Sequence, residues 1–354
     1  MKNIEKYLSL LGQEVDGLLL TSRYSRFYGA EYDIAEGVAI VTKAGCRYFT
    51  DCRYIEAAQN GIRDMEVIET NRANPYSKLI NDALAQFGVE RLGYEESYLS
   101  VAELMDFQRD LKAELIPVGK QINNFRAVKE DWELERIRKA QAITDKAFSQ
   151  VLERIHAGMT EKELQAELIY CLYKNGAEGL SFDPIGVSGP NTSLPHGVAT
   201  DRVIREGDFI TMDFGVLLGG YCSDMTRTVA VGFATEEMKT VYNTVLAAQL
   251  AGLAATRAGV TGAQIDGAAR QVIKDAGYGD YFGHGYGHSL GMEVHESPNC
   301  NPSGNVAMEP GMVSSAEPGI YLPGKFGVRI EDLVFFTADG HENITHSPKN
   351  LIIV

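Results

Sequence analysis

The sequence predicts an N-terminal α/β domain followed by a second domain of long helices and β-hairpins with a pseudo-symmetric core. Three observations favour this fold class. Strand-like and helix-like stretches alternate over the first 120 residues, a helix-and-loop pattern then occurs twice, and two hairpins carry facing acids. The length of 354 residues also fits two domains better than one. Apolar residues make up 45% of the chain, which is enough for a sizeable core.

The first domain is predicted from short apolar runs that alternate with helical patterns. Buried strands are expected at residues 15–20 and 37–41, a shorter strand at 47–51, and helices at 54–60 and 78–87. These residues contain no arrangement of side chains that indicates catalysis.

The second domain begins with a long amphipathic helix, expected over residues 130–156, whose apolar residues recur at helical spacing. We place the domain boundary just before this helix. The first domain is therefore expected to span residues 1–122 and the second residues 123–354.

A weak internal repeat follows the long helix. Capping boxes open two helices 101 residues apart, Thr160 with Glu163 in the first and Thr261 with Gln264 in the second. A loop that carries glycine and histidine follows each helix. Two similar halves indicate a pseudo-symmetric core with a site between them. Each helix is expected to end at a glycine, Gly176 or Gly277.

Residues 208–231 read as a β-hairpin with Leu218-Gly219 at its centre. In that register Asp213 faces Asp224, with Cβ atoms roughly 5 Å apart. Aspartate is disfavoured in strands, and like charges that face each other are destabilising. This pair therefore needs a positive charge nearby.

A second hairpin repeats the arrangement. Residues 314–321 and 327–335 flank Gly324, and a hairpin centred there places Glu317 opposite Glu331. Acids on a strand face are commonly solvated, but these acids have apolar neighbours in the sequence. Buried acids without a counter-charge cost several kcal/mol each. Two divalent cations would balance the four carboxylates and would form a hydrolytic centre.

Four of the seven histidines lie in two glycine-rich loops: His196, His284, His288 and His295. A lone histidine is more commonly structural, and His284 stays nearest to that interpretation. His288 is expected in a loop and His295 in a strand that starts at residue 292, so that one ligates metal and the other contacts substrate. Oxygen ligands favour Mn²⁺, and an added imidazole keeps Co²⁺, Fe²⁺ and Zn²⁺ as alternatives.

Charge and motifs exclude several other classes. A formal net charge of −15 argues against nucleic-acid binding, and no apolar run is long enough to span a membrane. The N-terminus does not read as a signal peptide, and five cysteines without a CxxC motif suit a reducing compartment, so a cytoplasmic protein is expected. Dinucleotide, phosphate-loop, serine-hydrolase and HExxH motifs are missing.

These residues together resemble the pita-bread metallopeptidases, specifically the Xaa-Pro aminopeptidase and Xaa-Pro dipeptidase (prolidase) branch. The resemblance implies a creatinase-like α/β N-terminal domain and an α+β pita-bread domain, in which helices cover an antiparallel sheet with pseudo-twofold symmetry. Methionine aminopeptidases lack such an N-terminal domain, and creatinases lack the metal carboxylates. The matching stretches are Pro195–Gly197, Met212–Gly215, Tyr221–Thr228, His284–Glu296, Ala316–Gly319 and Val328–Asp332.

The resemblance also implies the ligands of a dinuclear centre. Asp213 would chelate one ion, Asp224 and Glu331 would bridge both, and His288 and Glu317 would complete the coordination of the second ion. Glu317 would in addition handle the proton of the attacking water, so that a metal-bridging hydroxide cuts the peptide bond.

Further residues are expected to meet the substrate. His196 and His295 would hydrogen-bond the scissile region and stabilise the tetrahedral intermediate. Arg329 would position the site or meet a substrate carboxylate. Three departures from the family pattern remove no ligand, and those at 286 and 289 are expected to reshape the substrate pocket: Ser315 for Thr, Ser289 for Gly and Tyr286 for an aliphatic residue.

We therefore expect a homodimeric exopeptidase, with two divalent ions per subunit, that cleaves the bond before proline in short peptides. Two alternatives stay open. One is a hydrolase or lyase that acts on a small non-peptide substrate, and the other is a non-catalytic binding module on the same fold. The sequence also leaves open whether the enzyme is a dipeptidase or an aminopeptidase, the native metal and the role of the N-terminal domain.

Overall fold

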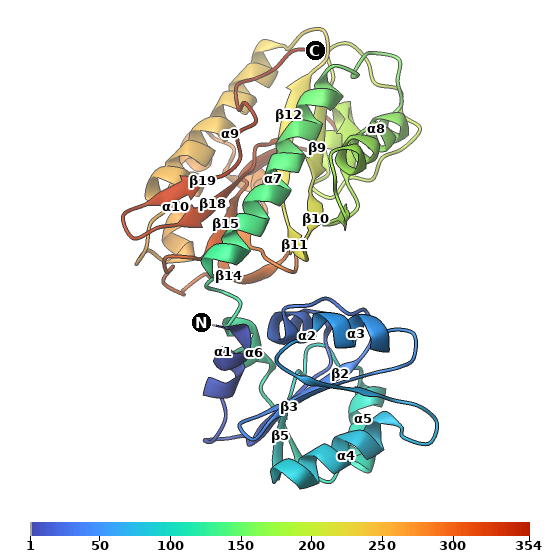
Figure 1. Cartoon of the computed structure of the whole chain (residues 1–354). Coiled ribbons are helices and arrows are strands. Elements are labelled where there is room, and N and C mark those ends of the chain that lie inside the picture. The colour runs from blue at the N-terminus through green and yellow to red at the C-terminus, as the bar shows by residue number, and fades with distance from the viewer. Residues whose placement is uncertain (1) are drawn as a thin grey trace. The chain divides into compact units, whose positions relative to one another are not determined.

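The computed structural model describes residues 2–354, which form two compact units that divide after Arg126 (Figure 1). The first unit holds a mixed six-stranded sheet in the order β4-β3-β2-β1-β5-β6. Its central strand β1 is antiparallel to β2 and parallel to β5. The strands are β1 (Gly17–Leu20), β2 (Val38–Thr42), β3 (Cys46–Thr50), β4 (Glu66–Glu69), β5 (Arg91–Tyr94) and β6 (Glu114–Pro117).

Helices cover both faces of this sheet, with α2 and α3 on one side and α4 and α5 on the other (Figure 1). Both faces are apolar, because β1 and β2 are buried along their whole length. The predicted strands and helices of this unit form within two residues of their expected ends. The helices are α1 (Asn3–Ser9), α2 (Arg23–Ala30), α3 (Ile55–Gly61), α4 (Tyr76–Phe87), α5 (Val101–Asp110) and α6 (Gly119–Asn124).

The second unit is built from two similar halves, which confirms the predicted repeat. The helix pair α7 (Asp131–Leu152) and α8 (Glu161–Lys174) corresponds to α9 (Glu236–Ala255) and α10 (Gly262–Asp275). Both predicted capping boxes form, and a glycine with positive φ follows the end of α8 and of α10. Each capping threonine also makes an isolated β-bridge, to residue 203 in the first half and to residue 307 in the second.

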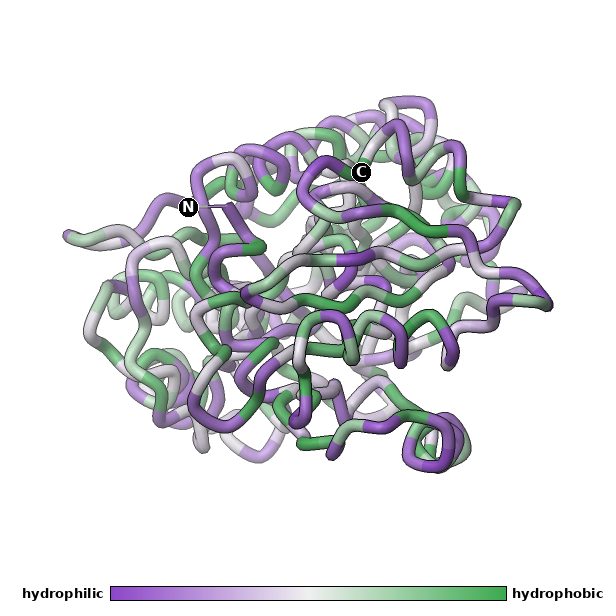
Figure 2. The backbone as a smooth tube through the Cα atoms, turned by 60° about the horizontal axis from the view of Figure 1, so that its bottom comes forward, coloured by the Kyte–Doolittle hydropathy of each residue, from purple (hydrophilic) through white to green (hydrophobic). Residues whose placement is uncertain are grey.

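Each half has its own core. The first packs α7 and α8 on β9, β10 and β12, and the second packs α9 and α10 on the strands after residue 286. Figure 2 shows hydrophobic and hydrophilic residues alternating along the helices, as expected for helices that cover a sheet. The strands are β7 (Gly179–Leu180), β8 (Ile185–Ser188), β9 (Phe209–Phe214), β10 (Val216–Leu218), β11 (Tyr221–Cys222), β12 (Met225–Ala230), β13 (Gly287–Ser289), β14 (Glu296–Cys300), β15 (Val313–Ala316), β16 (Gly319–Leu322), β17 (Phe326–Arg329), β18 (Asp332–Phe336) and β19 (His341–Asn343).

The first hairpin forms, but its predicted register is wrong. Gly219 and Gly220 form the turn, with φ of 55° and 79°, so the centre lies one residue later than expected. Positive φ at both central residues defines a type I′ turn, whose twist matches that of the flanking strands. Asp213 consequently pairs with Thr226 instead of Asp224.

The second hairpin has the predicted register. β16 pairs with β17 and β15 pairs with β18, and both pairings follow the register centred on Gly324, whose φ is 74°. Glu317 and Glu331 lie between these two ladders, opposite each other in the continuous register. Over residues 2–354, no helix combines the length and apolarity that a membrane span requires.

Candidate metal centre

The five predicted ligands come from both halves of the second unit. Asp213 lies in β9 and Asp224 directly precedes β12, whereas His288 lies in β13. Glu317 separates β15 from β16, and Glu331 separates β17 from β18. Three of the four acids therefore stand where one strand ladder ends and another begins.

The backbone explains why the second hairpin opens at its two glutamates. The amide of Glu317 donates to the carbonyl of Tyr286 at 2.7 Å, and the amide of Glu331 donates to the carbonyl of Thr226 at 3.0 Å. The two glutamates are thus bonded to other strands rather than to each other. The Thr226 contact ties the second hairpin to the first.

The side chains of four predicted ligands converge. Ligand atoms of Asp224, His288 and Glu331 all lie within 4.8 Å of one another. His288 Nε2 is 3.6 Å from Asp224 Oδ2 and 3.3 Å from Glu317 Oε1. A single divalent ion, which binds its ligands at about 2.0–2.2 Å, could reach several of these atoms at once.

The tautomer of His288 suits a ligand. Its Nδ1 lies 3.1 Å from the carbonyl oxygen of Ser289, which can only accept a hydrogen bond. Nδ1 therefore carries the proton, and Nε2 presents its lone pair to the acids. A ligating histidine is commonly fixed by such a bond from its other ring nitrogen.

Three carboxylate oxygens of the predicted ligands are buried and have no hydrogen-bond partner in the described part of the chain: Asp213 Oδ1, Asp224 Oδ1 and Glu331 Oε1. Buried polar atoms are nearly always partnered. Unpartnered oxygens around one imidazole lone pair are the donor set that a divalent cation takes. The residues therefore fit a metal centre.

Electrostatics leads to the same conclusion. Burial, followed by the charge of Glu331, raises the pKa of Asp224 well above its ordinary value. Burial, followed by the charge of Glu317, does the same to the pKa of Glu331, whereas burial lowers the pKa of His288. Carboxylates in this place ionise readily only when a cation compensates them.

Arg329 holds Asp213. The Arg329 Nη2 atom lies 2.5 Å from Asp213 Oδ2, and Nη1 donates to the hydroxyl of Tyr321 at 2.8 Å and to the carbonyl of Pro195 at 3.1 Å. Its Nε donates to the Thr226 hydroxyl at 3.0 Å. Since the guanidinium is buried and bonded on every nitrogen, its contacts support the positioning role that the sequence left open.

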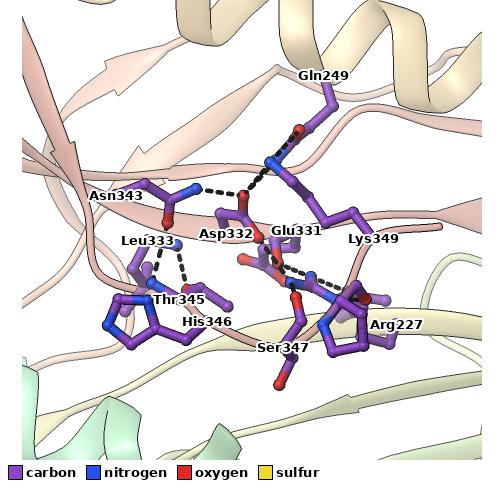
Figure 3. Close-up of polar contacts among 12 residues, drawn as sticks. Arg227, Gln249, Glu331, Asp332, Leu333, Asn343, Thr345, His346, Ser347 and Lys349 are labelled. Carbon is purple, nitrogen blue, oxygen red and sulfur yellow. Dashed lines mark hydrogen bonds and ion pairs between the residues drawn. The ribbon is translucent and has the colours of Figure 1, made fainter.

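A buried ionic network behind the site fixes the backbone at Glu331 (Figure 3). Arg227 donates to the carbonyl of Glu331 and, at 2.8 Å, to Asp332 Oδ1. Both side chains of this ion pair are almost fully buried. The other oxygen of Asp332 accepts hydrogen bonds from three more side chains, those of Gln249, Asn343 and Lys349. Sequence reasoning missed this pair, although both residues lie inside apolar strands, where a charge requires a partner.

Ser315 connects two of the predicted ligands. Its hydroxyl donates to Glu317 Oε1 at 3.0 Å and accepts from the backbone amide of His288 at 2.9 Å. Serine and threonine share this hydroxyl, so the departure from the family pattern at 315 preserves the contact.

The prediction of a loop at His288 and a strand at His295 is wrong, because the structure has the reverse. His288 lies in β13, and His295 lies in the bend that precedes β14. The two rings are nevertheless close, with centroids 4.4 Å apart. His295 and the predicted substrate contact His196 are both exposed, as residues that meet a substrate have to be.

Two other aromatic residues near the site are held inside the structure. Tyr286 is 1% exposed and donates its hydroxyl to the carbonyl of Gln249 in α9. It packs in the core, so the prediction that it lines the substrate pocket is wrong. His284 Nε2 lies 2.9 Å from the Tyr321 hydroxyl, in agreement with its structural interpretation.

A buried cluster of carboxylates with one imidazole, set between two pseudo-symmetric halves, is typical of a metal-dependent enzyme. The model of metallopeptidase family M24 matches residues 135–338, and that of the creatinase/prolidase N-terminal domain matches residues 4–128. The chain therefore belongs to metallopeptidase family M24, with a creatinase-type N-terminal domain, which confirms the resemblance and the fold class read from the sequence.

Relatives and solved structures cover the whole chain. An uncharacterized peptidase of Bacillus subtilis, YqhT, is 40% identical over 353 residues, 99% of both chains. A solved Xaa-Pro dipeptidase from Bacillus anthracis is 40% identical with a TM-score of 0.97, and covers 100% of this chain and 99% of its own. An X-Pro aminopeptidase from Thermotoga maritima is 34% identical with a TM-score of 0.93 over 99% of both chains.

Proposed function

We propose that this metallopeptidase is a dinuclear exopeptidase that hydrolyses the peptide bond before proline in short peptides. The proposal is carried by three carboxylate oxygens, of Asp213, Asp224 and Glu331, that are buried without a hydrogen-bond partner in residues 2–354. Ligand atoms of Asp224, Glu331 and His288 lie within 4.8 Å of one another. The relatives named Xaa-Pro dipeptidase and X-Pro aminopeptidase support the substrate class.

The proposed ligands are the five residues that the sequence predicts, Asp213, Asp224, His288, Glu317 and Glu331. Two divalent ions held there would activate a water molecule and polarise the scissile carbonyl. Glu317 would accept the proton of that water, and burial raises the pKa of its carboxyl group, which suits a general base.

The remaining residues act on the substrate or on the ligands. His196 and His295, both exposed, would donate hydrogen bonds to the carbonyl oxygen as it gains negative charge. Arg329 would hold Asp213 through the ion pair described above. We do not retain Tyr286 among the substrate contacts.

The metal and the assembly are part of the proposal. Mn²⁺ is proposed because four of the five ligands are carboxylates, with Co²⁺, Fe²⁺ and Zn²⁺ as competitors for the same site. A homodimer in the cytoplasm is also proposed. Five free cysteines in residues 2–354 suit a reducing compartment. Analytical ultracentrifugation tests the dimer, and an active enzyme that sediments only as a monomer would contradict it.

The function is tested with the Mn²⁺-loaded protein on Ala-Pro and on Ala-Pro-Ala. Release of proline from the dipeptide indicates a dipeptidase, and release of the dipeptide Pro-Ala from the tripeptide indicates an aminopeptidase. Asp224→Asn should abolish either activity and lower the bound metal, whereas Asp339→Asn, at an exposed acid of the same unit, should leave both unchanged.

Two outcomes would defeat the proposal. A protein that retains two ions per chain but turns over neither peptide would favour a small non-peptide substrate, which a panel of esters and amides would identify. Near-zero bound metal after exposure to Mn²⁺ and desalting would favour a non-catalytic binding module.

A further inference from the structure

Glu161 is a buried acid that the proposed chemistry does not use. It is the first residue of α8 and is 0% exposed. Its Oε1 accepts from the backbone amide of Ser188 at 2.7 Å and from the hydroxyl of the same residue at 2.9 Å. Its Oε2 accepts from the amide and hydroxyl of Thr200, at 2.9 Å and 2.7 Å. The side-chain amide of Asn191 donates to both oxygens.

These donors bracket the turn that carries His196. Ser188 ends β8, and Thr200 follows the turn, so one carboxylate fastens both ends of the segment 188–200. The middle of the segment is fastened on its other side to β17. There the amide of Gly327 donates to the Thr192 hydroxyl at 2.8 Å, and Arg329 donates to the Pro195 carbonyl.

The turn is therefore held between α8 and β17, and His196 itself is exposed. His196 follows Pro195, whose carbonyl accepts a hydrogen bond from Arg329, and the same guanidinium bonds Asp213, so the turn adjoins the candidate metal centre. The position of the His196 imidazole depends on the backbone that Glu161 holds.

We propose that Glu161 is a positioning residue that fixes the His196 turn so that its imidazole reaches the substrate. Glu161 touches neither the substrate nor the metal ligands in this role. The inference rests on the proposed function, in which His196 contacts the substrate.

Replacing Glu161 with glutamine tests this role, because glutamine has nearly the same shape as glutamate but different hydrogen-bonding groups. Each carboxylate oxygen of Glu161 accepts from a backbone amide, that of Ser188 on one side and that of Thr200 on the other. A backbone N–H can only donate. The side-chain NH₂ of a glutamine must therefore face one of these donors, so Glu161→Gln releases at least one end of the segment.

The experiment compares Glu161→Gln, His196→Ala and the double variant in the Mn²⁺-loaded enzyme. Glu161→Gln should lower kcat/KM by up to about 100-fold, the scale of a misplaced contact, while two ions per chain stay bound. Because the effect passes through His196, the double variant should be no slower than His196→Ala alone. Losses that multiply in the double variant, or unchanged kcat/KM in Glu161→Gln, would overturn the proposal.

Hydrogen exchange gives a readout that does not depend on activity. Amides of residues 188–200 should exchange faster in Glu161→Gln, while those of β13 and β18 stay protected. Unchanged amide exchange in residues 188–200 would show that Glu161 does not hold this segment. If the wild-type enzyme cleaves no Xaa-Pro peptide, the proposed function fails, and the exchange result still decides whether Glu161 holds the turn.

A matched variant distinguishes a specific effect of Glu161 from a general loss of folding. Glu163 lies in the same first turn of α8 and is exposed, and the corresponding capping box in the second half uses Gln264. Glu163→Gln should therefore change neither exchange nor activity. If Glu161→Gln does not fold, Thr200→Val serves instead, because it removes one of the hydroxyl groups that bond Glu161. We expect smaller changes in the same direction, both in kcat/KM and in the exchange of residues 188–200.

Discussion

The Nη2 atom of Arg329 lies 2.5 Å from one carboxylate oxygen of Asp213, and the other oxygen of Asp213 is buried without a hydrogen-bond partner among residues 2–354. The arginine thus orients the carboxylate and leaves one oxygen free for a cation. This pair links β17 of the second half to β9 of the first half.

Arg329→Lys should weaken metal binding. Lysine cannot reproduce a planar fork that bonds Asp213, Thr226 and Tyr321 together. We expect the Mn²⁺ affinity, measured by isothermal titration calorimetry, to fall by about 10- to 100-fold, as for other partners of metal ligands. Arg109→Lys, at an exposed arginine of α5, is the control. Unchanged affinity in Arg329→Lys would remove its positioning role.

The metal-free protein should lose stability as the pH rises. Burial raises the pKa of Asp224 and of Glu331 above their ordinary values of 3.8 and 4.5. Above about pH 4 the folded state therefore keeps protons that the unfolded chain has released. Since the unfolded state then binds fewer protons, the free energy of unfolding falls with rising pH until the raised pKa values are passed.

Urea unfolding of the chelator-treated protein between about pH 5 and about pH 8 measures this slope. Bound metal should reverse the trend, because metal binding releases these protons and is favoured at higher pH. The prediction would be contradicted if the free energy of unfolding of the metal-free protein stayed constant or rose over this pH range.

Asp332→Asn should destabilise the second unit strongly. The change removes the negative charge of a buried carboxylate that forms ion pairs with both Arg227 and Lys349. Breaking a buried ion pair from one side typically costs about 3–5 kcal/mol. Chemical denaturation should show this loss in Asp332→Asn but not in Asp339→Asn, whose side chain is exposed in a turn. A loss below about 1 kcal/mol would mean that the network contributes little.

Ser315 offers a paired test at one position. Ser315→Thr keeps the hydroxyl that joins His288 to Glu317 and should retain full activity. Ser315→Ala removes it, and we expect kcat to fall by about 10-fold or more because Glu317 loses a fixed orientation. Activity on Ala-Pro at saturating Mn²⁺ compares the two. Equal rates in the alanine and threonine variants would show that the hydroxyl is dispensable.

The sequence is most informative where the local rules are strong. Capping boxes at Thr160 and Thr261 and the buried runs of the first sheet appear in the structure as predicted. The first hairpin turns at Gly219-Gly220 instead of the predicted Leu218-Gly219, because a type I′ turn prefers glycine at both central positions. Gly219-Gly220 therefore gives the better centre.

Other features escape the sequence because they depend on distant contacts. Tyr286 stands among glycines, and only the fold reveals that α9 covers it. Arg227 and Asp332 are 105 residues apart, so neither indicates the other in the sequence. His288 joins a strand through β14, which no local pattern near His288 specifies.

The division of the proposed ligands between the halves has an evolutionary consequence. The half with α7 and α8 provides Asp213 and Asp224, and the half with α9 and α10 provides His288, Glu317 and Glu331. If the halves arose by duplication, an ancestral single copy could have formed such a centre only by pairing with a second copy. Fusion of the genes would then have let each copy diverge, so that one half came to supply the imidazole and the other kept only acids.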